Sequence, residues 1–192
     1  MQTKAFLTFA AAVLCLLTVN GCSVSTREND NGKKKDVDIR TPFGSLSVRE
    51  GHTDVKETGL SLYPGARPKK DDDDGHGNAK VDIASSLVGL KVVALKFESD
   101  DSPDKVLSFY RKEMGKYGKV LDCTGGFDLN FRGHRDKDAE VTCDGHDSSH
   151  GYKEELKVGT ENNQRILAIK PLGNGSEFAV VYVKTWDGSD KM

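Results

Sequence analysis

The sequence predicts an α+β domain in which an antiparallel β-sheet is covered on one face by one main α-helix. Three observations support this prediction. A single segment, about 102–117, carries apolar residues at helical spacing. Several short segments with alternating apolar residues lie before and after it. Short connections, such as Val88-Gly89 and Asn174-Gly175, favour antiparallel pairing of those segments.

The helix is predicted from a start signal and an apolar stripe. Ser102 is a suitable N-cap whose hydroxyl can accept a backbone N–H, and Pro103 follows at the first helical position. Gly115 and Gly118 can both end the helix, and Gly118 is favoured. The stripe expected to face the sheet consists of Val106, Leu107, Tyr110, Met114 and Tyr117.

The strands are predicted from alternation and β-branched composition. Segments 90–98 and 176–186 carry apolar residues on both faces, so we expect them to be central. An apolar piece at 60–66 ends in a Pro-Gly turn. The remaining predicted strands are a hairpin over 36–50 and the segments 79–86, 119–124, 139–144, 155–159 and 164–170.

The N-terminus has the pattern of an export signal. Lys4 precedes an apolar run, 5–19, that is short for a bilayer span and typical of a signal peptide. The run ends in Val19-Asn20-Gly21-Cys22, which resembles the lipobox of bacterial lipoproteins. This resemblance implies cleavage before Cys22 and lipidation of Cys22. In that family a residue such as Ser23 after the cysteine implies the outer membrane.

These features predict the domain organisation. Residues 1–21 are expected to be a signal peptide and 22–36 a flexible, lipid-anchored tether, because the segment is polar and lacks apolar periodicity. Residues 37–192 are expected to form a single α+β domain, with the 37–50 hairpin at its periphery. That hairpin also resembles one repeat of the adhesin families of bacterial surface proteins.

The cysteines predict one disulfide. Cys15 leaves with the signal and Cys22 is expected to carry lipid, which leaves Cys123 and Cys143 in an oxidising compartment. Each shares a strand face with an apolar neighbour, so we expect both to point into the core. A metal site is the alternative, since four zinc-type ligands are available in Cys123, Cys143, His146 and His150.

Two further clusters invite functional hypotheses. Asp71–Asp74 could bind calcium, but Lys70 occupies the first position of an EF-hand alignment, which favours a solvated loop. The cluster His134, Asp136, Asp138 and Glu140 could serve acid–base chemistry, but a glycine-flanked charged loop is a poor platform for it. Motifs for phosphate, dinucleotide or metalloprotease chemistry are missing from the sequence.

The lipobox, together with VDIRTPFG, YPGA and DSPDKVLSFY, resembles a type of uncharacterised bacterial envelope lipoprotein, mainly through Tyr63–Ala66 and Asp101–Tyr110. The net charge of −2 gives no support for nucleic-acid binding. We therefore expect a non-enzymatic lipoprotein without cofactors, at the periplasmic face of the outer membrane. Its expected partners are the membrane, through the anchor, and another envelope protein. The alternatives are a metal- or ligand-binding module and a periplasmic hydrolase.

Overall fold

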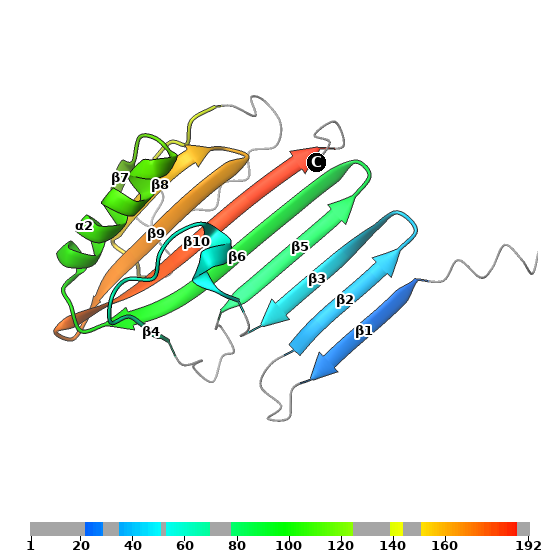
Figure 1. Ribbon diagram of the computed structural model, residues 1–192, viewed down its shortest axis with the longest axis horizontal. Helices are drawn as coiled ribbons and strands as arrows, with labels where there is room; N and C mark the ends of the chain where they lie inside the picture. The colour runs from blue at the N-terminus through cyan, green and yellow to red at the C-terminus, as the bar shows by residue number, and fades with distance from the viewer. Residues whose placement is uncertain are drawn as a thin grey trace, which may run out of the picture.

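A computed structural model describes residues 22–28, 35–50, 53–69, 78–124, 139–143 and 151–187. They form one ten-stranded antiparallel sheet in the order β1-β2-β3-β5-β6-β10-β9-β8-β7, with β4 paired to β6 outside this path (Figure 1). The predicted antiparallel sheet and its one α-helix are present, but strands dominate the described residues. The strands are β1 (Ser23–Glu28), β2 (Lys35–Thr41), β3 (Gly44–Glu50), β4 (Arg67–Pro68), β5 (Ala79–Ser85), β6 (Val88–Ser99), β7 (Leu121–Thr124), β8 (Glu154–Thr160), β9 (Asn163–Leu172) and β10 (Gly175–Asp187).

The two longest strands, β6 and β10, lie side by side in the middle of the sheet. Their position confirms that the segments with apolar residues on both faces are central. Phe178 and Val180 of β10 point to one face, whereas Val181 and Val183 point to the other, and all four are buried. A strand covered on both faces loses apolar surface to water on each side, which favours a continuous apolar sequence.

The helix α2 (Pro103–Met114) lies on one face of the sheet, over its C-terminal strands. Its stripe is buried as predicted at Val106, Leu107, Tyr110 and Met114. These side chains share one core with apolar residues of β6, β8, β9 and β10: Val93, Leu95, Phe97, Leu156, Val158, Leu167, Ile169, Phe178 and Val180.

Both ends of the helix differ from the prediction. Ser102 has the extended backbone of an N-cap, but its side chain makes no capping hydrogen bond. The α-helix ends at Met114, and a 3-10 turn, η2 (Gly115–Tyr117), continues to Gly118, whose φ of 135° favours glycine.

Tyr117 is 37% exposed and therefore does not belong to the core. Its hydroxyl donates to the Gly59 carbonyl, and its ring stacks under Arg165, whose Cζ lies 3.5 Å from the ring centroid. Arg165 in turn donates from Nε to the carbonyl of Thr58, in the 3-10 turn η1 (Val55–Thr58), at 2.8 Å. The tyrosine is thus held by polar and cation–π contacts that join η1, η2 and β9.

The apolar piece at 60–66 packs against α2. The Tyr63 N–H donates to the Tyr110 hydroxyl at 3.3 Å, and the Tyr63 hydroxyl donates to Asp101 Oδ2 at 2.9 Å. The predicted Pro-Gly turn is present, closed by a 3.0 Å bond from the Ala66 N–H to the Tyr63 carbonyl. The two segments that carry the family resemblance, YPGA and DSPDKVLSFY, therefore contact one another.

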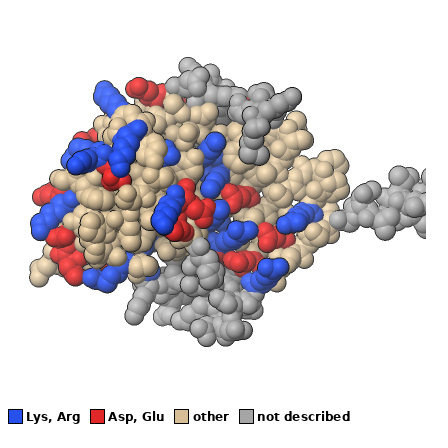
Figure 2. Space-filling view, in the orientation of Figure 1, with Lys and Arg blue, Asp and Glu red and all other residues tan. Residues whose placement is uncertain are grey.

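Strands β1, β2, β3 and β5 extend the sheet beyond the helix, and we call these four strands the wing. The α2 face of the wing is polar, and Figure 2, drawn from that side, shows acidic and basic side chains mixed across the molecule. The opposite face is apolar, as the cross-strand pairs Ile39↔Leu46 and Val48↔Val81 illustrate. The predicted hairpin thus belongs to the continuous sheet, through the pairing of β3 with β5.

The structure differs from the sequence prediction in two other segments. Residues 23–28, expected in the tether, form β1, whose Val24 pairs with Ile39 of β2. Alternating β-branched residues suit a strand, and β2 supplies an edge for it to pair with. Segment 139–144 was expected to be a strand, but its described part makes an isolated bridge, Glu140↔Thr160.

Removing the Tyr110 side chain should test the core assignment of the helix. Tyr110→Ala deletes a fully buried ring and leaves a cavity, so we expect the free energy of unfolding to fall by about 2–5 kcal/mol. Leu107→Ala should cost a similar amount. The exposed Lys112→Ala is the control and should change stability by about 0.5 kcal/mol or less. Urea midpoints that match wild type for Tyr110→Ala would contradict the assignment.

Candidate functional site

Cys22 lies directly before β1 at the outer edge of the sheet. It is exposed and, among the described residues, is the cysteine outside a disulfide. The neighbouring residues of β1 are also exposed, including Val24 at 66%. An accessible thiol at the start of an edge strand can carry a bulky modification without disturbing the core.

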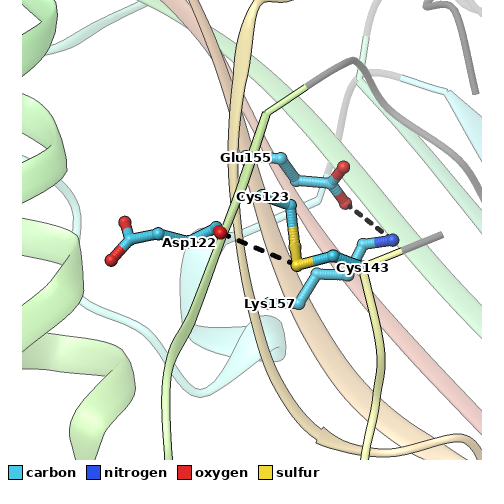
Figure 3. The surroundings of a disulfide bond; sticks show 5 residues. All are labelled: Asp122, Cys123, Cys143, Glu155 and Lys157. Atoms are coloured by element: carbon cyan, nitrogen blue, oxygen red, sulfur yellow. Dashed lines mark hydrogen bonds and ion pairs between the residues drawn. A yellow bond between two sulfur atoms is a disulfide. The ribbon is translucent and has the colours of Figure 1, made fainter. Parts of the chain in front are cut away.

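The predicted disulfide between Cys123 and Cys143 is present, with the Cα atoms 5.4 Å apart. It lies on the sheet face opposite α2, since Asp122 points to the helix side and binds Arg111 there, through Oδ1 at 2.6 Å (Figure 3). Cys123 is buried, but Cys143 is exposed, so the expectation that both thiols enter the core holds for the first alone. Cys143 Sγ lies 3.7 Å from the carbonyl oxygen of Asp122.

An ion pair is buried beside the disulfide. Glu155 and Lys157 project from the same face of β8 and place Oε1 and Nζ 3.3 Å apart (Figure 3). They are 2% and 5% exposed, and in register they oppose Cys123 and Leu121 of β7. Removing either partner would leave an uncompensated charge away from water, which is costly. Sequence reasoning missed this pair, although the parity of 155 and 157 in a strand placed them on one face.

A second buried cluster surrounds Glu177 on the same face. Lys69 Nζ lies 2.9 Å from Glu177 Oε2, Lys170 Nζ lies 3.2 Å from Oε1, and the Tyr152 hydroxyl donates to Oε1 at 3.2 Å. Burial raises the carboxyl pKa, but the bonds and charges of the two lysines outweigh it, so the pKa of Glu177 is lowered from 4.5. Burial and the Glu177 charge raise the pKa of Tyr152.

This cluster satisfies its own polar groups and holds the sheet together. Its members come from sequence positions 69 to 177, so local sequence patterns could not indicate it. Glu177 is 3% exposed, which leaves the carboxylate without access for a substrate. The arrangement therefore acts as a structural ion-pair network.

The other sequence candidates are placed only in part. Asp71–Asp74 and the residues His134, Asp136, Asp138, His146 and His150 lie outside the described residues. Glu140 is described and exposed, in its bridge to Thr160. Both cysteines of the alternative metal site are joined in the disulfide. In the described part of the chain, no group of three His, Cys, Asp or Glu residues could hold a metal ion.

No helix among the described residues is long and apolar enough to cross a membrane.

The disulfide should contribute to stability by restricting the unfolded chain. Its cysteines are 20 residues apart, so the chain-entropy model gives a loss of about 3 kcal/mol for Cys123→Ser/Cys143→Ser in urea unfolding. Mass spectrometry of alkylated, unreduced protein should find no alkyl group at either position. Alkylation of both in native material, with stability that falls on adding a chelator, would instead support the metal site.

The Glu177 network should make stability depend on pH. The pKa of Glu177 is lower in the folded protein than the ordinary value of 4.5, so the ionised carboxylate contributes stability above pH 4.5. This contribution is lost as the pH falls through the folded-state pKa. Glu177→Gln should be less stable than wild type at pH 7, and the difference should shrink below pH about 4.5. Denaturant unfolding across this range measures the difference. A constant difference at all pH values would contradict the assignment.

A comparison with known proteins finds no matching family model, no matching curated protein and no matching solved structure. What can be inferred about function therefore comes from the residues of this chain.

Proposed function

We propose that the chain is a lipid-anchored envelope lipoprotein with a non-catalytic binding or structural role. The observation that carries the proposal is the position of Cys22. The sequence before it is an apolar run that ends in a lipobox-like Val19-Asn20-Gly21-Cys22, and Cys22 itself is exposed directly before the edge strand β1.

Other features support the same proposal. The disulfide between Cys123 and Cys143 fits an exported protein, because such bonds persist in oxidising compartments. The buried carboxylates Glu155 and Glu177 are ion-paired to lysines, which favours a structural role for these groups over a catalytic one. The wide sheet, with one polar and one apolar face on its wing, supplies surface for a partner in the envelope.

Replacement of Cys22 tests the anchor. In cells grown with labelled palmitate, wild-type protein should take up label and fractionate with membranes. Cys22→Ser should lose the label and should not be processed at the wild-type position, because the nucleophile that receives the lipid is gone. The matched control is Ser23→Ala, which changes the next residue and should keep both label and fractionation. Equal labelling of wild type and Cys22→Ser would contradict the proposal.

A further inference from the structure

One end of the sheet brings two hairpin turns level with Cys22. In the β1–β2 pairing, Ser23 lies opposite Arg40, so Cys22 lies beside the turn 41–44 that joins β2 to β3. The β3–β5 pairing places the turn between β5 and β6 at the same end. Figure 1 shows both turns on the side of the sheet where β1 begins.

The exposed apolar side chains at this end form what we call the tip surface: Val24, Phe43, Leu87 and Val88. Their exposed fractions are 66%, 84%, 75% and 49%, respectively. The two turns, 41–44 and 85–88, contain no charged residue, although 30% of the chain is charged. Moving large apolar side chains from water into an apolar phase lowers the free energy, so uncharged hairpin tips that carry them favour such a phase.

The two turns also use the same hydrogen-bonding arrangement. In the first, the Thr41 hydroxyl accepts from the Phe43 N–H at 3.2 Å and donates to the Gly44 carbonyl at 3.0 Å. In the second turn, the Ser85 hydroxyl accepts from the N–H groups of Leu87 and Val88 at 3.2 and 3.0 Å, respectively.

The Ser85 hydroxyl of the second turn also donates to the Val88 carbonyl at 2.9 Å. At both tips, several backbone groups are thus paired with a side-chain hydroxyl within the turn. This pairing lowers the cost of moving the tips out of water, because a polar group left unpaired in an apolar environment is expensive.

The geometry places the tip surface close to the lipid that we propose at Cys22. Val24 is two residues from Cys22, a separation of at most about 7 Å in an extended chain. From β1 to β6 the strands cross four spacings, roughly 20 Å in all, so both tips lie in one row with the anchor. Trp186, which opposes Gly89 next to the second turn, is half-buried at the same end, and tryptophan favours the membrane interface.

We propose that the tip surface inserts into the interfacial layer of the bilayer that holds the lipid on Cys22. The inference rests on the lipid anchor proposed above and adds the surface by which the folded domain contacts the membrane. In this orientation the β2–β3 and β5–β6 turns lie in the interfacial layer of the bilayer. The β9–β10 turn, at the other end of the sheet, points away from the bilayer.

Matched labels at the two ends of the sheet test this orientation. The full chain is purified with its lipid and placed in phosphatidylethanolamine–phosphatidylglycerol vesicles that contain nitroxide-labelled lipid. Leu87→Cys and the control Leu172→Cys each carry an environment-sensitive fluorophore. Both positions are exposed at hairpin turns, at 75% and 45%, but Leu172 lies at the opposite end.

The fluorophore at position 87 should shift to shorter wavelength and be quenched by the nitroxide lipid, whereas the one at 172 should stay water-exposed. Equal lack of quenching at both positions, in protein that floats with the vesicles, would overturn the insertion and leave the anchor intact. If mass spectrometry finds no lipid on Cys22 and the protein does not float with the vesicles, the proposed anchor itself is overturned. A shielded but unquenched position 87 that cross-links between copies would assign the surface to a dimer.

Removal of the apolar tips gives a second, label-free measurement. Trp186 is the single tryptophan of the chain, so its emission reports this end of the sheet directly. Phe43→Ser/Leu87→Ser should lose quenching of Trp186 by nitroxide lipid, while Leu172→Ser should keep it. Both variants replace exposed side chains, so circular dichroism should match wild type. Unchanged quenching in the double variant would overturn the proposal.

Discussion

The pairing of β6 with β10 is the interaction on which the rest of the structure depends. It runs from Val88↔Asp187 to Ser99↔Ser176, and it joins the wing to the C-terminal strands. Phe97 and Phe178, one from each strand, place their ring centroids 5.6 Å apart beneath the helix. A helix of 12 residues is marginal alone, so α2 depends on the surface that this pair provides.

On the face opposite α2, the strands on the two sides of the central β6–β10 pair carry different kinds of side chain. On the C-terminal side, the face opposite α2 buries two carboxylates next to lysines: Glu155 beside the buried Lys157, and Glu177 beside the partly buried Lys69 and Lys170. Such pairs offset their own desolvation when the geometry is close, and the disulfide fixes the chain beside one of them. On the wing, the same face carries aliphatic side chains that are half-buried by their cross-strand neighbours.

The position of β1 determines how a lipid on Cys22 would be placed relative to the domain. A flexible tether would let the domain rotate freely relative to the membrane, so the domain would have no defined orientation. Because β1 starts at Ser23, the residue after Cys22 already belongs to the sheet. A lipid on Cys22 would therefore hold one defined end of the fold against the bilayer, and the hairpin tips at that end become candidates for direct lipid contact.

The sequence by itself determined the local elements. The spacing of Leu107, Tyr110 and Met114 required a helix with one buried face, and the apolar composition of β6 and β10 required central strands. The predicted pairing of Cys123 with Cys143 is present, although Cys143 is exposed and lies outside a strand. These features depend on residues that are close in the chain or on periodicities that one face of an element must obey.

The tertiary structure decided what depends on distant partners. Polar residues 23–28 became a strand because β2 offered an edge, and Tyr117 left the core because Arg165 and Gly59 bind it. The Glu177 network and the alignment of two hairpin tips with Cys22 arise from strand order and register. No local pattern encodes these, because pairings between residues tens of positions apart are selected by the packing of the whole sheet.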